Sequence, residues 1–560
     1  MKKLLILYIV LIGYINASYP HPVFGENGMV VSTSRQASIA GIGILKKGGN
    51  AIDAACATGF VLAVTSSSNG NIGGGGFMVV HKENSKIFTL DYREIAPAAA
   101  HRDMFLDSKG EVIDNMSLRT RAASGVPGSV DGLLKAWKDH GSGNISRREL
   151  LASAIALAER GFELTHYEAK RFNNNKDLFL NNNAAAKVFI REDRKPWKAG
   201  DRFIQKDLAR SLKRISREGR DGFYTGKTAD LIVEEMNRGI GLITHEDLLN
   251  YESKYRDPMT GSFKGYEIIS MGLPSSGGTI LIEMLNMLEK FPLTDLGWNS
   301  SEYIHLLTEV ERRAYADRAE HLGDSDYWTP PSSLLTSKKY AIDRMNDFYA
   351  DKATSSTDIF AGDPSDYESP ETTHYSVIDK EGNAVSVTTT INLGYGGGIL
   401  VEGAGFFLNN EMDDFSAKPG VPNAFGLVGN AANAIQPGKR PLSSMTPTIV
   451  LKNKEPFLIL GSPGGSRIIT AVLQTILNVT VHNMNIQKAV SAPRVHSQWL
   501  PDVIMAESHS IIKDVETSLI KKGHKILPYK NVGDVNAILI NEDGYFGGTD
   551  IRGENTAIGY

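Results

Sequence analysis

The sequence is poor in the residues that build disulfides and metal centres. Cys56 is the only cysteine among 560 residues, so an intramolecular disulfide is impossible and no cysteine cluster can bind zinc. The 13 histidines form neither an HExxH motif nor a Cys-His pattern, so the sequence predicts no metal site. Cys56 lies in the apolar run 51–64 and is expected to be a small core residue.

An excess of charge of either sign is also missing. The chain has 60 Lys and Arg against 64 Asp and Glu, a net charge of −4, which gives no electrostatic reason to expect nucleic-acid binding. No internal repeat, low-complexity tail or internal membrane helix is visible. The length alone would suggest two to four domains with a large core, but no obvious linker divides the chain.

Residues 1–17 resemble a secretory signal. Lys2 and Lys3 form the charged start, residues 4–14 are apolar, and residues 15–17 (Ile-Asn-Ala) form a small-residue cut site. An N-terminal membrane anchor is the alternative, although the apolar run is short for a span. The chain is expected to be exported but can form no intramolecular disulfide, and this combination favours a location in a bacterial periplasm.

The most informative stretch is a predicted hairpin over residues 372–390. A segment rich in Ser, Asp and Pro, residues 354–371, precedes it and is expected to be a mobile loop. Residues 375–379 then alternate in polarity, residues 380–382 (Lys-Glu-Gly) form a turn, and residues 384–391 alternate again. A three-residue loop with glycine third fits a type I turn followed by a left-handed glycine.

The turn fixes the register of this hairpin. It pairs Asp379 with Asn383 and puts Thr390 opposite Thr372, with Cα atoms about 5 Å apart. One face is small and polar and the other apolar, so the apolar face should meet the core. The polar face carries Thr372, His374, Ser376, Ala384, Ser386 and Thr388, and the apolar face Tyr375, Val377, Val385 and Val387. A small polar face beside a mobile loop suits a site better than a packed layer, but a surface hairpin with ordinary strand threonines fits the pattern equally well.

Elements around the hairpin alternate between helical and extended patterns. Helices are expected over residues 32–47, 50–64, 148–160, 299–322 and 466–481 and within the charged stretch 165–240, and strands over 77–81, 87–92, 448–451 and 457–460. The charges of the 299–322 helix are expected to face solvent. The glycine-rich stretch 71–77 lacks the Lys-Ser/Thr of a phosphate loop and indicates close backbone packing. Strands on both sides of Thr372 favour a layered α+β domain.

Two motifs in the hairpin resemble a known family. Thr-Thr-His-Tyr-Ser at residues 372–376, followed by Asp-Lys-Glu-Gly-Asn-Ala-Val at 379–385, resembles the start of the small subunit of bacterial gamma-glutamyltransferases, which are N-terminal-nucleophile hydrolases. The resemblance covers nearly the whole chain after the signal segment. It implies a four-layer αββα sandwich and a self-made cut between Glu371 and Thr372. The products would be a large subunit, 18–371, and a small catalytic subunit, 372–560, sharing one core.

The expected cut makes chemical sense because a terminal threonine carries a nucleophile and a base on one residue. Its hydroxyl can attack an amide carbonyl while the α-amine, with an ordinary pKa of about 8, accepts the proton. An internal threonine has no such amine, so we expect the Thr372 hydroxyl to attack the Glu371 carbonyl and the resulting ester to hydrolyse. Thr390, opposite Thr372, is expected to orient the new amine.

The resemblance also implies the residues that bind substrate. Backbone N–H groups of Gly464 and Gly465, at the start of a helix, would form the oxyanion hole. The α-carboxylate of a γ-glutamyl substrate would meet a guanidinium and hydroxyls, and its ammonium would meet carboxylates and an amide oxygen. The residues so implied are Arg93, Ser443 and Ser444 for the carboxylate, and Asn392, Glu411 and Asp414 for the ammonium.

A loop over residues 419–430 matches the lid loop of bacterial members. The family usually has an aromatic residue with a hydroxyl at the tip of this loop, where Phe425 stands here. The substitution removes the hydroxyl that would latch the lid by a hydrogen bond.

The sequence therefore predicts a periplasmic, self-processing gamma-glutamyltransferase and glutathione hydrolase. It would pass the glutamyl group of glutathione, glutamine or other γ-glutamyl amides to water, an amino acid or a peptide, with no cofactor, no nucleic-acid partner and no stable membrane insertion. A cephalosporin or glutaryl acylase of the same fold is the first alternative. A non-catalytic binding protein that retains the glutamyl pocket is the second.

Overall fold

Two antiparallel seven-stranded sheets stacked face to face form the centre of the protein. The structure is a computed structural model that describes residues 20–359 and 372–560, so the predicted signal segment and Glu371 lie outside the described residues. The first sheet has the order β19-β2-β10-β11-β3-β4-β7 and the second the order β1-β18-β17-β13-β12-β9-β8.

The strands of the two sheets come from both ends of the chain. The first sheet consists of β2 (Gly28–Ser32), β3 (Gly75–His81), β4 (Ile87–Asp91), β7 (Lys254–Arg256), β10 (Thr373–Asp379), β11 (Ala384–Thr390) and β19 (Thr556–Gly559). The second consists of β1 (Val23–Gly25), β8 (Met259–Phe263), β9 (Tyr266–Ser270), β12 (Thr448–Lys452), β13 (Glu455–Gly461), β17 (Asn536–Asn541) and β18 (Gly544–Thr549). Two small sheets contain β5 (Phe162–Glu163) with β6 (Arg202–Phe203), and β14 (Val495–His496) with β15 (Ile504–Glu507) and β16 (Ile526–Tyr529).

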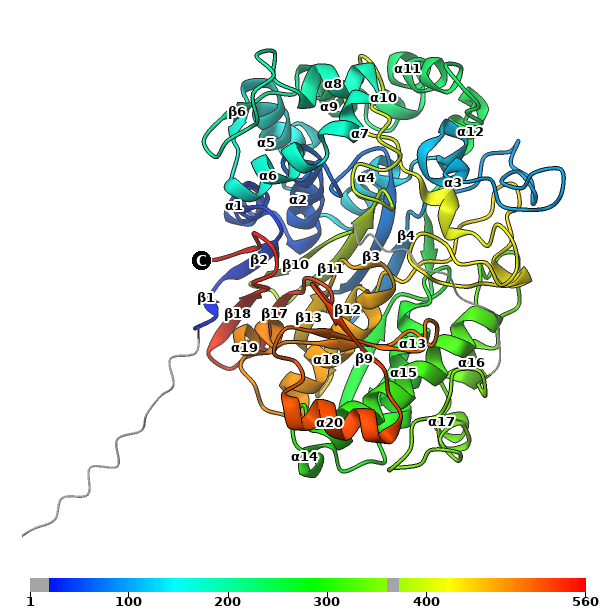
Figure 1. The fold of residues 1–560 in the computed structure, drawn as a ribbon. Coiled ribbons are helices and arrows are strands. Elements are labelled where there is room, and N and C mark those ends of the chain that lie inside the picture. Colours follow the sequence, from blue (N-terminus) through cyan, green and yellow to red (C-terminus); the bar gives the residue numbers. More distant parts are fainter. Residues whose placement is uncertain (1–19, 360–371) are drawn as a thin grey trace, which may run out of the picture.

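Helices cover the outer face of each sheet (Figure 1). Those on the side of the first sheet are α1 (Arg35–Lys46), α2 (Ala51–Thr65), α3 (Met116–Arg119), α4 (Ser129–His140), α5 (Arg147–Arg160), α6 (His166–Asn174), α7 (Lys176–Leu180), α8 (Asn183–Phe189), α9 (Lys206–Glu218), α10 (Asp221–Tyr224), α11 (Gly226–Met236) and α12 (His245–Asn250). Those on the side of the second are α13 (Gly277–Leu288), α14 (Leu293–Leu296), α15 (Ser301–His321), α16 (Ser332–Leu335), α17 (Lys338–Arg344), α18 (Ile468–Thr480), α19 (Ile486–Ser491) and α20 (Lys513–Lys522). Among the described residues, no helix combines the length and apolar character needed to cross a membrane.

Alternating side chains build the four layers. On β2, Val30 packs into the core under α1 and α2, whereas Met29 and Val31 pack into the core shared with the second sheet. This period of two is what a strand buried on both faces requires. The predicted αββα sandwich is therefore confirmed.

The predicted hairpin is β10 and β11, at the centre of the first sheet. Thr373 pairs with Thr389, and the backbone N–H of Asp379 donates to the carbonyl oxygen of Asn383 at 3.2 Å, so the register is the predicted one. The neighbours of the hairpin, β2 and β3, precede residue 372 in the chain, and the two parts of the chain thus share one sheet.

The polar face of this hairpin was predicted to form a site rather than a packed layer. For the residues that follow Thr372 this prediction is wrong. The hydroxyl of Ser376 donates to the Asn536 carbonyl at 3.2 Å and that of Ser386 to the Leu460 carbonyl at 3.0 Å, both on the second sheet. The His374 ring lies over Gly461, where a Cβ would be 2.4 Å from the ring. Small polar side chains let the two sheets approach and bond to each other, and burial lowers the pKa of His374 to about 3.

The prediction that the charges of the 299–322 helix face solvent is also wrong. Nearly the whole of α15 is buried, because α20 and the segment after α17 cover it. Arg313 donates to Glu309 within the helix at 2.6 Å, and Glu309 accepts the backbone N–H of Thr354 at 3.0 Å. Ser300 caps the helix by accepting the N–H of Tyr303 at 3.1 Å.

Candidate active site

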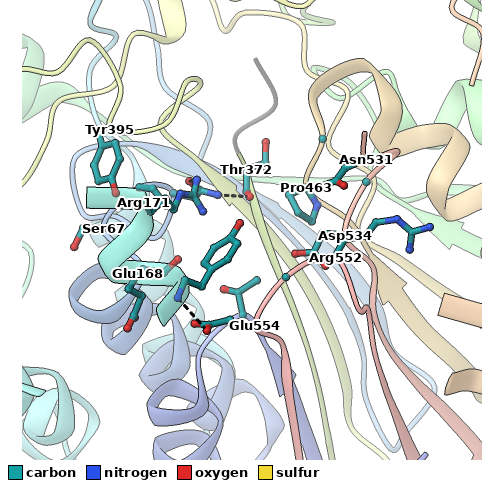
Figure 2. A pocket seen from close by; sticks show the side chains of 18 of the residues that line it. Ser67, Glu168, Arg171, Thr372, Tyr395, Pro463, Asn531, Asp534, Arg552 and Glu554 are labelled. Carbon is teal, nitrogen blue, oxygen red and sulfur yellow. Dashed lines mark hydrogen bonds between the residues drawn. The ribbon is translucent and has the colours of Figure 1, made fainter. Parts of the chain in front are cut away.

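The predicted site residues meet at the open end of the hairpin, around a small cavity that we call the inner cavity. Its volume is about 20 Å³, and nine predicted residues line it: Arg93, Thr372, Thr390, Asn392, Glu411, Asp414, Ser443, Ser444 and Gly465. Gly464 lines a second, larger cavity of about 470 Å³, the outer cavity, which Thr372 also lines. Figure 2 shows Thr372 in the outer cavity, between Arg171 of α6 and the opposite wall with Pro463 and Asn531.

Thr372 and Thr390 stand at the ends of the two paired strands. Thr372 lies directly before β10 and is buried, and its carbonyl oxygen accepts a hydrogen bond of 2.6 Å from the side-chain amide of Asn69. Thr390 ends β11, and its hydroxyl accepts the backbone N–H of Asn392 at 2.8 Å. Both side chains line the inner cavity, as the predicted register requires.

Arg93 lies two residues after β4 and is directed into the cavity by its neighbours. Its N–H donates to Asp91 at 2.9 Å, and its guanidinium donates to the Pro441 carbonyl at 3.2 Å. The guanidinium is ion-paired with both Glu411 and Asp414, the latter at 2.5 Å. Burial alone would lower the pKa of Arg93, but these carboxylates raise it above its usual value. The residues predicted to hold opposite ends of a substrate thus hold each other here.

Two charged residues of the site escaped the sequence analysis. Glu94, next to Arg93, has an oxygen 3.8 Å from the guanidinium, and burial raises its pKa to about 7. Arg318 of α15 donates to the hydroxyls of Ser276 at 2.9 Å and Ser444 at 3.1 Å, and burial lowers its pKa to about 10. Glu94 could have been predicted because it adjoins Arg93 in the sequence. Arg318 could not, because the charges of its helix were expected to face solvent.

Four hydrogen-bond acceptor atoms of the site are buried without a hydrogen bond, and two of them are the carboxylate oxygens of Glu94. The side-chain oxygen of Asn392 and Oε2 of Glu411 are buried without a hydrogen bond, although the amide nitrogen of Asn392 donates to the Asn410 carbonyl at 2.9 Å. A buried acceptor left unsatisfied costs about 1–3 kcal/mol. An ammonium group, with three N–H donors and a positive charge, is the partner that suits both atoms.

Gly464 and Gly465 occupy the turn before α18. Their φ values are 140° and 56°, in the region that favours glycine, and a Cβ on Gly465 would lie 2.4 Å from the Phe425 ring. Gly464 precedes and Gly465 begins a short 3₁₀ turn, Gly465–Arg467, which leads into α18, so the two glycines lie one turn before the α-helix rather than at its start.

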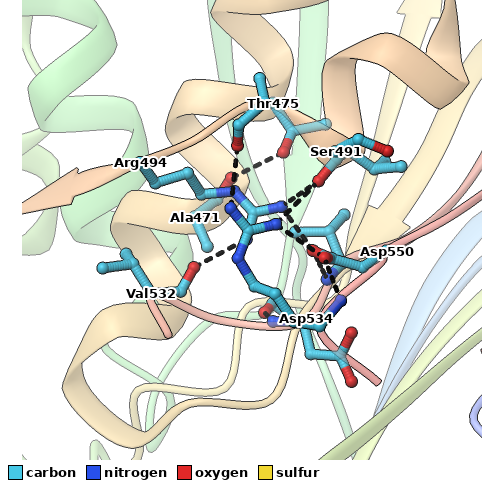
Figure 3. A network of polar contacts seen from close by, with 12 residues as sticks. Ala471, Thr475, Ser491, Arg494, Val532, Asp534 and Asp550 are labelled. Carbon is cyan, nitrogen blue, oxygen red and sulfur yellow. Dashed lines mark hydrogen bonds and ion pairs between the residues drawn. The ribbon is translucent and has the colours of Figure 1, made fainter. Parts of the chain in front are cut away.

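A buried arginine holds the loop that supports Gly464. A Cβ on Gly464 would lie 3.2 Å from the Cα of Gly533. One residue before Gly533, the Val532 carbonyl accepts a 2.7 Å hydrogen bond from Arg494, which is also paired with Asp550 at 2.5 Å (Figure 3). The main chain that carries the predicted oxyanion glycine therefore rests on a fixed polar network.

The 419–430 loop covers the inner cavity without a tyrosine hydroxyl. Asn423 donates to Asp414 at 3.1 Å, and the backbone N–H of Ala424 donates to Asp413 at 3.0 Å. Phe425 is buried and accepts a hydrogen bond from Gln498 at its carbonyl, at 3.2 Å. The loop is thus held over the site by contacts that need no hydroxyl at position 425. A cavity of about 20 Å³ holds about one water molecule, so an acyl chain enters only if these contacts open.

One group of described side chains has the composition of a metal site, but its members form hydrogen bonds and an ion pair with protein groups. His305, Glu309 and His524 are buried together. The two imidazoles hydrogen-bond each other at 2.7 Å, and Glu309 is paired with Arg313. None of the three lines the inner or the outer cavity, and the absence of a metal from the reaction stays a prediction.

Comparisons with known proteins agree on one family. The model of the gamma-glutamyltranspeptidase family matches residues 37–560. A glutathione hydrolase proenzyme from Escherichia coli (strain K12) is 44% identical over 533 residues, which cover 95% of this chain and 91% of the relative. The solved structure of Helicobacter pylori gamma-glutamyltranspeptidase is 40% identical with a TM-score of 0.59, covering 62% of this chain and 97% of its own. A cephalosporin acylase from Bacillus halodurans is 25% identical with a TM-score of 0.85, covering 99% of both chains. The chain belongs to the gamma-glutamyltranspeptidase family.

Proposed function

We propose that this protein is a self-processing gamma-glutamyltransferase and glutathione hydrolase in which Thr372 is the nucleophile. The observation that carries the proposal is that Thr372 lines both the inner and the outer cavity. An amide carbonyl placed at its hydroxyl would therefore have its acyl chain in the inner cavity and its amine in the outer one. The inner cavity holds charges of both signs, as a zwitterionic acyl group requires.

The ion pairs of the inner cavity support an exchange of partners on binding. The α-carboxylate of a γ-glutamyl group would take the Arg93 guanidinium, with hydroxyls of Ser443 and Ser444 beside it. The α-ammonium would replace Arg93 at Glu411 and Asp414 and reach the unpartnered oxygen of Asn392. Each charge lost within the protein is thereby regained from the substrate.

The catalytic cycle uses only groups of this chain. After the cut before Thr372, its hydroxyl attacks the γ-carbonyl carbon and passes its proton to its own α-amine. The N–H groups of Gly464 and Gly465 stabilise the resulting oxyanion, and Thr390 orients the amine. The bond to the leaving amine then breaks, the leaving nitrogen takes the proton, and a glutamyl ester of Thr372 remains. Water or an acceptor amine attacks this ester, restores the hydroxyl and carries the glutamyl group away.

In the cut itself the Thr372 hydroxyl attacks the carbonyl carbon of Glu371, the acyl group moves from the nitrogen to the oxygen, and the nitrogen takes the proton and becomes the free α-amine. Water then hydrolyses the ester. The solved chain from Helicobacter pylori corresponds to 62% of this chain, a share close to that of the proposed large subunit, residues 18–371. This correspondence supports a boundary before Thr372 and a small subunit of residues 372–560.

The acylase alternative has weaker support. An acylase proenzyme from Pseudomonas sp. (strain SE83) is 37% identical to this chain, against 44% for the glutathione hydrolase proenzyme. A glutaryl group has no α-ammonium, so it would leave the oxygens of Asn392 and Glu411 without a partner. The two alternatives predict different substrates, and a comparison of γ-glutamyl with glutaryl anilide separates them.

The place of action follows from the N-terminal segment. We propose that residues 1–17 direct the chain to a bacterial periplasm, where it would meet glutathione, glutamine and other γ-glutamyl amides as donors. Amino acids and peptides would serve as acceptors. Sequencing the N-terminus of the large subunit from periplasmic extracts tests this assignment, and an intact Met1 there would contradict it.

Self-cleavage and glutamate release test the proposal together. From 61.0 kDa for 560 residues, purified protein should give bands of roughly 38 and 21 kDa, the smaller beginning Thr-Thr-His-Tyr, and should release glutamate from γ-glutamyl-p-nitroanilide. Thr372→Ala should remain a single inactive chain. Full turnover by uncut Thr372→Ala protein would contradict the mechanism. Tight glutathione binding by an intact wild-type chain, without glutamate release, would favour the binding-protein alternative.

A further inference from the structure

Thr372 lies just beyond the last paired residues of β10 in the first sheet. Asp379 and Asn383 form a hydrogen-bonded pair, and hydrogen-bonded and non-hydrogen-bonded pairs alternate along an antiparallel ladder. Counting in steps of two makes Thr372 and Thr390 a non-hydrogen-bonded pair, so the main-chain N–H and C=O of Thr372 point away from β11. On that side β2 ends at Ser32, three positions short of Thr372 in the register. None of the described strands supplies a partner there.

The side chain of Asn69 takes the place of the missing strand. Its amide nitrogen donates to the Thr372 carbonyl at 2.6 Å, and its oxygen accepts a hydrogen bond from Arg171 of α6 at 3.3 Å. Asn69 is 7% exposed, so water does not readily substitute for either bond. The amide is held from both ends and cannot turn without breaking one of these contacts.

A second asparagine holds the other strand end. Asn71 donates to the Thr390 carbonyl at 2.8 Å and to the Asn69 carbonyl at 2.9 Å, while its oxygen accepts the N–H of Gly74 at 2.8 Å. At Gly74 a Cβ would lie 2.2 Å from the Thr390 carbonyl oxygen. The glycine-rich stretch 71–77 is thus packed against the hairpin, as expected from its sequence. The two asparagines hydrogen-bond the carbonyl groups of Thr372 and Thr390 at the two strand ends.

We propose that Asn69 is a positioning residue, which holds the carbonyl of Thr372 so that its hydroxyl and α-amine keep the geometry for attack. The inference rests on the proposed function in so far as Thr372 is the nucleophile. Once the chain is cut, no residue precedes Thr372, so its α-amine depends on Thr390 and on the bonds at the carbonyl side of Thr372 for its position. The carbonyl belongs to the plane of the peptide bond between Thr372 and Thr373. By holding it, Asn69 fixes that plane and with it the position of the Thr372 Cα atom, from which the amine and the hydroxyl project toward the substrate carbonyl.

The role predicts a loss of rate without a loss of affinity. Asn69→Ala removes the donor, and Asn69→Asp replaces it with a carboxylate of the same shape that repels the carbonyl and still accepts from Arg171. For both variants we expect kcat on γ-glutamyl-p-nitroanilide, per processed chain, to fall roughly tenfold or more, with KM within about twofold of wild type. Self-cleavage, followed on denaturing gels, should slow by a similar factor. The affinity for glutamate, measured by isothermal titration, should not change because the inner cavity is untouched.

A matched control removes the same kind of bond elsewhere. Asn144 also donates its side-chain amide to a backbone carbonyl, that of Gly48, at 2.8 Å, but it lines neither the inner nor the outer cavity. Asn144→Ala should keep the wild-type kcat and self-cleavage rate. Thermal melts of all three variants establish that each is folded, and the isosteric Asn69→Asp covers the case in which Asn69→Ala is not.

Two results would overturn the inference. One is a folded Asn69 variant whose kcat and self-cleavage rate both stay within about twofold of wild type. The other is a raised KM at unchanged kcat, which would make Asn69 a substrate contact. A wild type that cuts itself but releases no glutamate would refute the proposed function alone, because the rate of self-cleavage still reports on Asn69.

Discussion

Removing the α-ammonium from the substrate is the sharpest test of the inner cavity. A glutaryl amide has the same acyl chain and carboxylate as a γ-glutamyl amide but lacks the cation. When its carboxylate takes Arg93, Glu411 and Asp414 lose their partner and gain nothing in return. Two like charges then remain buried together, and one of them must take up a proton.

The structure sets the size of the effect. The side-chain oxygens of Asn392 and Glu411 stay unpartnered with a glutaryl group, and each such acceptor costs about 1–3 kcal/mol. Their sum is consistent with at least a hundredfold preference in kcat/KM for γ-glutamyl over glutaryl anilide, which corresponds to about 2.7 kcal/mol. Discrimination of this size is typical of sites whose buried polar groups bind one substrate and are left unpaired by the other.

The assay compares the two p-nitroanilides at one pH, by absorbance of the released aniline. Asp414→Asn should reduce the preference mainly by losing activity on the γ-glutamyl substrate. Asp413→Asn is the comparison variant, because Asp413 contacts Ser117, Ala424 and Asn392 but not Arg93. Its preference for the γ-glutamyl substrate should fall less than that of Asp414→Asn. Equal kcat/KM of the wild-type enzyme on the two substrates would refute the reasoning and would favour the acylase alternative.

Two further predictions follow from the hairpin and the covering loop. Thr390→Ala should slow self-cleavage and lower kcat more than it changes KM, since Thr390 orients the amine rather than the substrate, and a change in KM alone would show that role to be wrong. Burial raises the pKa of Asp413 to about 7, so the stability that its protonated form contributes is present at low pH and is lost as the pH rises through about 7. Asp413→Asn should therefore gain melting temperature relative to wild type between pH 5 and pH 8, and a difference that is independent of pH would contradict this.

The parts of the site that could be predicted are those fixed by local pattern. The turn at residues 380–382 set the register, and the register put Thr390 opposite Thr372, as the structure has it. Arg93, Glu411 and Asp414 were found through the family resemblance, and they do meet at Thr372. Their pairing with one another could not be foreseen, because a sequence motif carries no information on what its residues contact when no substrate is bound.

The parts that were missed depend on packing between distant segments. Arg318 enters the site because α15 is covered from outside, and nothing in its charge pattern distinguishes a buried ion-pair network from a solvated face. Asn69 acts at Thr372 across 303 positions of sequence, through a gap left by the early end of β2. The polar face of the hairpin was misjudged for a related reason, since β13 and β17 of the second sheet, which accept its hydrogen bonds, come far later in the chain.

The position of β10 and β11 between β2 and β3 has a consequence for recovery from unfolding. Before a cut at Thr372, the chain can refold as a single molecule. After it, the central strands and their neighbours belong to separate polypeptides, so refolding becomes a second-order process that depends on protein concentration. The uncut chain should regain its fold after dilution from denaturant at any concentration, whereas the cut protein should do so only when both pieces are abundant. In dilute solution, the lifetime of the folded cut protein would then depend on its unfolding rate rather than on the equilibrium between the folded and unfolded states.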